Sequence, residues 1–333
     1  MLLSPLNNPP RTIDELLDPA LSASLDRLDI QSRRVFAGTL PGQRRSKRRG
    51  KSVEFDDFRQ YTPGDDLRHI DWNVFARLDR LILKLFRAEE DLCLFLGVDV
   101  SGSMLTGTPG YTSVAGKANT DSGHKLLYAT RLAMALAYLG LVNQNRVSVA
   151  TLGGAGGVKV LAPTRGRAGV HRVGEFWLTQ LAAAGKNPVP GDLNSDLTTL
   201  ARTRQGRGVM LILSDFLSPV SLVPGLNALA AGAAESYDVT CIQLLTDAEL
   251  DPTVARDAGL SGDLALQPAE GGQAIDVTVA APTIADYRQR LRQSIDRLHT
   301  DATARGIAHL LVPTSTPPSE ILLKELRRRG TLA

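Results

Sequence analysis

The sequence is poor in cysteine, since its 333 residues include only Cys93 and Cys241. Each cysteine lies in an apolar run typical of a strand, which indicates buried free thiols rather than a disulfide framework and favours a reducing compartment. No apolar run reaches the roughly 18 residues that a membrane span needs. The first 11 residues are proline-rich and lack the basic-then-apolar pattern of a signal peptide. We therefore expect a cytoplasmic protein.

Signatures of catalysis are also scarce. The sequence has no Gly-x-Ser-x-Gly nucleophile elbow. Its five histidines are scattered without metal-ligand spacing: His69, His124, His171, His299 and His309. The formal net charge of +3 implies neither a nucleic-acid coat nor an acidic tail. The length allows one large domain, or one domain with substantial additions, around a sizeable core.

One apolar run leads into a polar loop that can bind a metal ion. Residues 92–98 (LCLFLGV) are typical of a central strand that is covered on both faces. Asp99, Ser101 and Ser103 follow, so one carboxylate and two hydroxyls can converge beyond the strand's carboxyl end, where open α/β sheets bind ligands. These hard oxygen ligands suit Mg²⁺, Mn²⁺ or Ca²⁺. Alternatively the loop only caps the next helix, because Asp and Ser are favoured N-caps.

A second apolar run, residues 208–214 (GVMLILS), repeats this pattern and delivers Asp215 at its end. For Asp215 taken alone, an alternative reading is the N-cap of a following turn. Apolar runs alternate with helical patterns over the rest of the chain, which predicts an α/β fold. We expect strands at 81–86, 147–152, 158–161, 239–245 and 307–312, a hairpin at 263–267 and 274–279, and helices at 12–36, 125–142, 170–183, 223–235, 284–305 and 319–329.

Two charged segments precede the first central strand. Residues 44–51 (RRSKRRGK) favour a solvated loop or a contact with an acidic partner over nucleic acid, because aromatic residues are not interleaved. The phosphate-loop reading of Gly50-Lys51-Ser52 fails because Arg45 stands where that motif needs glycine. Residues 53–72 begin as a strand and are dense in Asp and Arg, and interlocking ion pairs that fix a loop are favoured over an active site.

Several unusual motifs occur together in one order. They are RRGKSVEF at 48–55, YTPGDDLRHIDW at 61–72, Ala76-Arg77 and DVSGSM at 99–104. In this the sequence resembles the bacterial family called domain of unknown function 58, which carries a von Willebrand factor A-like domain. The resemblance implies a Rossmann-like, mostly parallel sheet flanked by helices over residues 91–333, with an inserted hairpin. Residues 1–90 would form a helical and β extension packed on that domain.

The resemblance also implies a metal-ion-dependent adhesion site built from three loops. The first loop corresponds to Asp99, Ser101 and Ser103, and the third loop to Asp215. The second loop of the family supplies a Thr, and here Ser195 in the sequence GDLNSDL takes its place. Ser195 keeps the hydroxyl but lacks the methyl group that restricts a threonine rotamer. The Gly/Ser/Thr-rich residues 105–123 would lie next to this site.

These features together favour a metal-dependent protein-interaction module rather than an enzyme. A divalent cation, Mg²⁺ before Mn²⁺ or Ca²⁺, would keep one coordination position open for a Glu or Asp of a partner. By resemblance the partner is a MoxR-type AAA+ ATPase, and the module is an adaptor in chaperone-like assembly or remodelling. One alternative is a Mg²⁺-dependent hydrolase, with Asp196 or Asp65 as the general base. An aspartyl-phosphate mechanism is disfavoured because Ser101 stands where a second acid is needed. Another alternative is nucleic-acid binding through 44–51, which is less favoured.

Overall fold

The structure, a computed structural model, consists of two compact units: residues 1–39 with 92–333, and residues 40–91. Within them it describes residues 9–26, 28, 30, 54–62, 67, 70–87, 92–105, 124–154, 156–184, 191–233, 237–253, 262–266, 275–279 and 281–332. The basic run 44–51, most of 105–123 and Asp65 therefore lie outside the described residues. The N-terminal helices belong to the larger unit, so the predicted extension of residues 1–90 is divided between the two units.

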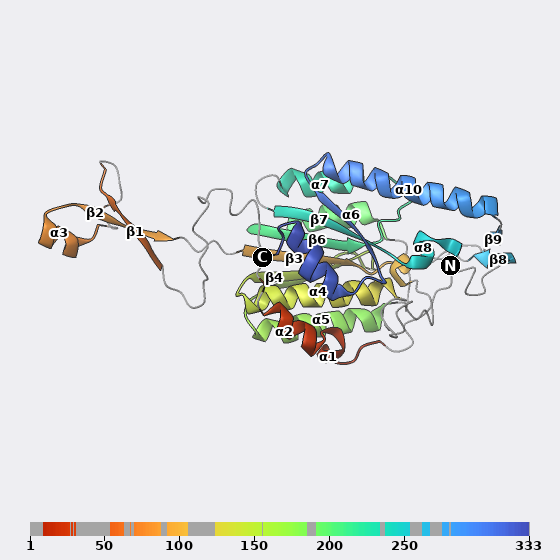
Figure 1. The fold of residues 1–333 in the computed structure, drawn as a ribbon, viewed down its shortest axis with the longest axis horizontal. Coiled ribbons are helices and arrows are strands. Elements are labelled where there is room, and N and C mark those ends of the chain that lie inside the picture. Colours follow the sequence, from red (N-terminus) through yellow and green to blue (C-terminus); the bar gives the residue numbers. More distant parts are fainter. Residues whose placement is uncertain are drawn as a thin grey trace. The chain divides into compact units, whose positions relative to one another are not determined.

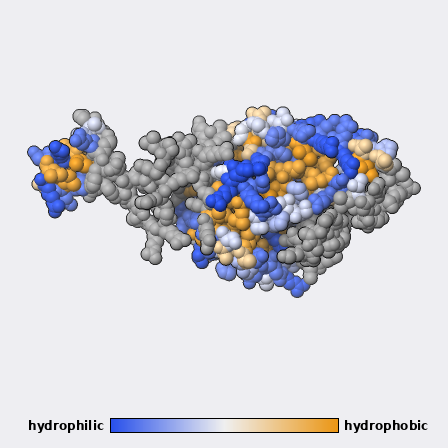
Figure 2. Space-filling model, viewed as in Figure 1, coloured by the Kyte–Doolittle hydropathy of each residue, from blue (hydrophilic) through white to orange (hydrophobic). Residues whose placement is uncertain are grey.

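The smaller unit is a hairpin with one short helix. Strand β1 (Glu54–Gln60) pairs antiparallel with β2 (Ile82–Arg87), and α3 (Trp72–Leu78) lies between them in the chain. Helix α3 was not predicted, although Asp71 supplies its N-cap by accepting hydrogen bonds from the backbone N–H groups of Asn73 and Val74 at 3.0 and 3.2 Å. Figure 2 shows apolar residues among hydrophilic ones on the surface of this unit. Two of its large apolar side chains are exposed, Trp72 to 60% and Leu78 to 64%.

The larger unit is built on a six-stranded sheet with the order β10-β7-β6-β3-β4-β5 in the described residues. Its strands are β3 (Leu92–Asp99), β4 (Arg146–Leu152), β5 (Lys159–Thr164), β6 (Arg207–Ser214), β7 (Tyr237–Leu245) and β10 (Ala308–Pro313). Every pairing is parallel except that of β5 with β4. Numbered along the chain from β3, these strands follow the order 3-2-1-4-5-6, which is that of the Rossmann fold. The predicted Rossmann-like, mostly parallel sheet is confirmed.

Helices cover both faces of this sheet (Figure 1). One face carries α4 (Lys125–Val142), α5 (Ala168–Ala183) and the short N-terminal helices, and the other carries α6 (Leu193–Thr203), α7 (Val223–Ala233) and α10 (Ala281–Thr303). Two apolar clusters result, one on each face of the sheet. Strand β3 is buried along its whole length, as expected for a central strand with both faces covered.

Helix α4 is the core helix of the first face. It is the one helix in the described residues that is long and apolar enough to cross a membrane by length and composition. However, 83% of its apolar window is buried inside the protein. Leu132, Met134 and Leu136 are at most 1% exposed and pack in the same cluster as β3. The burial explains its apolar composition without a membrane.

The helix expected over residues 12–36 is wrong in length. The structure has two short helices, α1 (Ile13–Leu16) and α2 (Pro19–Leu25). Pro19 starts the second one and Asp18 caps it by accepting a hydrogen bond from Ala20 N at 2.8 Å, because proline suits the first helical turn but not a helix interior. At the start of α1, Thr12 makes no side-chain cap bond, and Glu15 accepts a hydrogen bond from Arg11 N at 2.8 Å.

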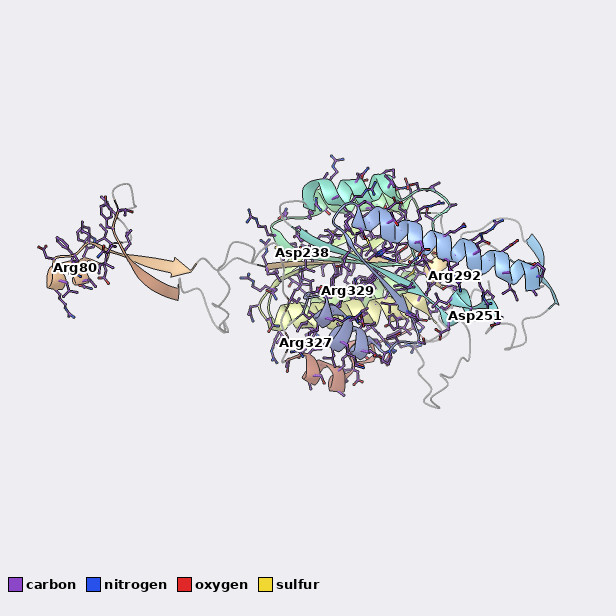
Figure 3. The ribbon with its side chains drawn as sticks, turned by 45° about the horizontal axis from the view of Figure 1, so that its top comes forward. Arg80, Asp238, Asp251, Arg292, Arg327 and Arg329 are labelled. Carbon is purple, nitrogen blue, oxygen red and sulfur yellow. The ribbon has the colours of Figure 1, made fainter. Side chains whose placement is uncertain are left out.

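The C-terminal third of the chain follows the prediction closely. The expected hairpin is present as β8 (Gly262–Leu266) and β9 (Ile275–Val279). The last predicted helix is three consecutive pieces: α11 (Pro318–Glu320), a π-helical turn (Ile321–Glu325) and α12 (Leu326–Arg328). Just after it, Arg329, labelled in Figure 3, donates from Nη1 to the His309 carbonyl oxygen at 3.0 Å and ties this end of the chain to β10.

Candidate functional site

The carboxyl ends of β3 and β6 meet at the point where the strand order of the sheet reverses. The chain runs from β3 to β4 on one side, whereas β6 lies on the other side of β3. Open α/β sheets bind ligands in the crevice at such a switch point. Asp99 ends β3, Ser214 ends β6, and Asp215 follows it. Polar residues from the two predicted loops are therefore neighbours.

Asp99 is the buried centre of this site, with 3% of its surface exposed. Its Oδ1 accepts a hydrogen bond from Ser101 N at 2.8 Å, and its Oδ2 accepts one from the Ser214 hydroxyl at 2.6 Å. Burial and the nearby charge of Asp215 raise the pKa of Asp99 to about 6, although the bonds from Ser214 and Ser101 oppose this shift. A buried carboxylate with too little compensating charge favours a cation beside it.

The two predicted serine ligands lie together. Ser101 is buried, Ser103 is half-buried, and their hydroxyl oxygens are 3.1 Å apart. A 3₁₀ turn over Gly102–Leu105 follows Ser101 and contains Ser103. No group of three or more His, Cys, Asp or Glu side chains that could hold a metal ion occurs in the described part of the chain. A cation here would consequently depend on hydroxyl as well as carboxylate oxygens.

Asp215 has a partner that the sequence did not indicate. The buried ammonium of Lys125, the first residue of α4, lies 2.9 Å from Asp215 Oδ2 and 2.6 Å from Glu249 Oε1. Asp215 Oδ1 accepts a hydrogen bond from Leu217 N at 3.1 Å. Glu249 belongs to the short helix α8 (Asp247–Leu250), where it forms a capping box with Thr246. Lys125 therefore links the end of β6 to the segment that follows β7.

Further hydrogen bonds hold the backbone around Asp215. Gln243 donates from Nε2 to the Asp215 carbonyl oxygen at 2.8 Å, and His309 Nε2 lies 3.1 Å from Gln243 Oε1. Because that oxygen only accepts, His309 donates from Nε2. Burial, together with the charges of His299 and Arg329, lowers the pKa of His309 to about 4, which keeps the ring neutral. Phe216 has a φ of 51°, an uncommon conformation outside glycine, and its N–H is bound to the Ser214 hydroxyl at 3.0 Å.

Gly153, just beyond the end of β4, completes one wall of the site. Its φ is +67°, and an added Cβ would lie 2.5 Å from Asp99 Oδ1 and 2.9 Å from Ser101 Cβ. Its N–H donates to Asp196 Oδ2 at 2.6 Å. Burial raises the pKa of Asp196, and the bond from Gly153 opposes the shift. This contact fixes the start of α6 next to Asp99.

The structure thus brings together Asp99, Ser101, Ser103 and Asp215, but it does not join Ser195 to them. Ser195 is exposed in the first turn of α6, which is N-capped by Asp192, and no hydrogen bond to the other four is present in the described residues. Its role as a ligand stays a prediction. Sequence reasoning missed Lys125, Ser214, Glu249 and Gly153. Of these four, only Ser214 could have been found from the sequence, because it is the polar residue at the end of an apolar run.

The residues present fit a hard divalent cation at Asp99, Ser101 and Ser103. Their donor atoms are one carboxylate and two hydroxyls, which is the chemistry that Mg²⁺, Mn²⁺ and Ca²⁺ accept. The carboxylate of Asp99 accepts hydrogen bonds from Ser101 and from the Ser214 hydroxyl, and its two oxygens together have about four lone pairs, so one remains for a cation. Asp215 would have to share its carboxylate with Lys125. The charge on this side of the site is therefore already partly neutralised.

The chain is similar to uncharacterized mycobacterial proteins. An uncharacterized protein of Mycobacterium bovis and one of Mycobacterium tuberculosis are each 30% identical over 324 residues, covering 95% of this chain and 92% of the relative. An uncharacterized protein of Mycobacterium avium is 30% identical over 167 residues, which is 47% of this chain and 89% of the relative.

Two solved structures match this chain at low similarity. An aerotolerance-related membrane protein from Bacteroides fragilis is 13% identical, with a TM-score of 0.39 over 71% of this chain and 99% of that one. The VWA domain of SpRpn10 is 13% identical, with a TM-score of 0.35 over 70% of this chain and 94% of that one. The family model described as protein of unknown function DUF58 matches residues 57–301, so the chain belongs to the DUF58 family.

Proposed function

We propose that this protein is a cytoplasmic protein-interaction module whose strand-end site binds a divalent cation, Mg²⁺ first, and through it an acidic side chain of a partner. The observation that carries the proposal is the convergence of Asp99, Ser101 and Ser103 with Asp215 at the switch point of the sheet. These groups supply hard oxygen donors and a buried excess of negative charge. A coordination position facing solvent would accept the partner's carboxylate.

The partner that we propose is a MoxR-type AAA+ ATPase, with this protein as an adaptor in chaperone-like assembly or remodelling. This part rests on the resemblance of the sequence motifs, and the site chemistry is compatible with it. Ion-mediated contact requires metal, so association of the two purified proteins should occur with Mg²⁺ and be lost in EDTA. Association that is unaffected by EDTA would contradict the role of the cation.

Thermal unfolding tests the cation site itself. The wild type and Asp99→Asn are unfolded in EDTA and then with Mg²⁺, Mn²⁺ or Ca²⁺, and Asp286→Asn on the exposed surface of α10 serves as the control. A cation that binds only the native state at 100 times its Kd adds about 2.7 kcal/mol to the free energy of unfolding. We expect this gain in the wild type and the control and its loss in Asp99→Asn. Equal gains in all three proteins would refute the site.

A second candidate function is a Mg²⁺-dependent hydrolase. The observation that favours it is the buried carboxylate of Asp196, which is held by Gly153 N next to Asp99 and has a raised pKa. Such a group can act as a general base towards a metal-bound water. Turnover of a phosphoester panel that is lost in both Asp99→Asn and Asp196→Asn would favour the hydrolase. Cation binding without turnover would favour the interaction module.

A further inference from the structure

Lys125 is a fully buried cation in direct contact with the candidate site. It is 0% exposed, and its Nζ forms ion pairs with Asp215 and Glu249 at 2.9 and 2.6 Å. The two carboxylates come from different parts of the chain, one from the loop after β6 and one from α8. Although burial acts against the charged form, Asp215 and Glu249 raise the pKa of Lys125 above its usual value, so the ammonium stays protonated.

The position of this lysine is unfavourable on general grounds. It is the first residue of α4, where the positive end of the helix dipole disfavours a cation. A buried ion pair also gains little over apolar residues of similar volume, because the desolvation cost offsets the attraction. The stability of the fold therefore does not explain why a lysine occupies this position. The neutralisation of Asp215 by Lys125 does explain it.

The charges of the site explain that effect. Asp99 and Asp215 are close enough for the charge of Asp215 to raise the pKa of Asp99. Of these two carboxylates, Lys125 forms an ion pair with Asp215 and not with Asp99 in the described contacts. A divalent cation bound to Asp99, Ser101 and Ser103 would be repelled by the ammonium and would compete with it for Asp215. Asp99, in contrast, has no cationic partner among its described contacts.

We propose that Lys125 is a built-in competitor of the divalent cation: it holds Asp215 when the site is empty, and it limits how tightly the site binds the cation. The inference rests on the cation site of the proposed function. It makes Lys125 a residue that tunes cation affinity without being a ligand. A site held in this way binds the cation weakly alone and more tightly when a partner's carboxylate adds negative charge.

The experiment compares cation affinity in two variants that share one substitution. Glu249→Gln keeps Lys125 on Asp215 and retains a side chain that suits a capping box. The double variant, Lys125→Gln with Glu249→Gln, removes the ammonium without leaving the Glu249 carboxylate buried and unpaired. Isothermal titration with Mg²⁺ and with Mn²⁺ gives the Kd of each protein, and the melting temperature in EDTA and in metal gives a second readout.

We expect the double variant to bind Mg²⁺ at least tenfold more tightly than Glu249→Gln and to gain more thermal stability from the metal. Equal or weaker binding by the double variant, with the wild type still binding, would overturn this inference and leave the proposed function standing. Binding by the double variant but not by the wild type would support the inference and overturn the proposed function. Absence of binding in all three proteins would overturn both. If the double variant does not fold, Lys125→Met with Glu249→Gln replaces it.

Discussion

Replacing Gly153 by alanine should disturb the site through one contact. Gly153 has a φ of +67°, and the added Cβ would lie 2.5 Å from Asp99 Oδ1, closer than van der Waals contact allows. Asp99 cannot move away freely, because both of its carboxylate oxygens are hydrogen-bonded, at 2.8 Å to Ser101 N and 2.6 Å to Ser214 Oγ. The backbone of Gly191 is also close to Gly153, since a Cβ on Gly191 would be 2.7 Å from Gly153 Cα.

The cost has two parts. A left-handed conformation costs an alanine roughly 1–2 kcal/mol. Crowding in a packed interior typically costs a further ~1–3 kcal/mol. The free energy of unfolding should therefore fall by about 2–5 kcal/mol. In a domain of this size the melting temperature falls by roughly 2 °C per kcal/mol.

Gly157→Ala provides a matched control, because Gly157 has a similar φ of +75° but an added Cβ meets no atom within 4 Å. Urea unfolding of the wild type and both variants gives the free energies. Gly157→Ala should lose only the backbone part, and Gly153→Ala should lose about 1–3 kcal/mol more. Equal losses of free energy in the two variants would show that a Cβ at position 153 is not crowded against Asp99.

Three further predictions concern buried groups. Lys125→Met alone should lower the free energy of unfolding by about 3–5 kcal/mol in urea, because it leaves two buried carboxylates without their cation; a loss below about 1 kcal/mol would contradict the buried ion pairs. Since burial lowers the pKa of His309 from its ordinary value near 6.5 to about 4, the folded state favours the neutral ring. The contribution of His309 to the free energy of unfolding should be full above pH 6.5 and should fall as the pH drops towards 4. His309→Gln should flatten this pH dependence, whereas His171→Gln at an exposed position should not. Cys93 and Cys241 are buried, and burial raises the pKa of Cys241 to about 12, so both should resist a thiol reagent at pH 8 until the protein unfolds. Rapid labelling of the native protein would contradict their burial.

Local sequence patterns predicted correctly those strands and helices whose structure depends on their own residues. The apolar run before Asp99 became a central strand that is buried throughout, and helix α4 has the predicted bounds, Lys125–Val142. The helix predicted from residue 12 onward was wrong because Pro19 begins a new helix instead of continuing the old one. Helix α3 was missed because its N-cap, Asp71, was read as part of a charged loop.

The α/β class, the two strands that lead to Asp99 and Asp215, and the hard oxygen donors after the first strand could all be predicted from the sequence. These features depend on residues that are neighbours in the chain, and the spacing of apolar and polar residues records them. Which of the polar residues come into contact depends instead on the tertiary structure. Ser214 reaches Asp99 across 115 residues, and Lys125 reaches Glu249 across 124. Such contacts depend on the order of the strands in the sheet, which no local pattern specifies.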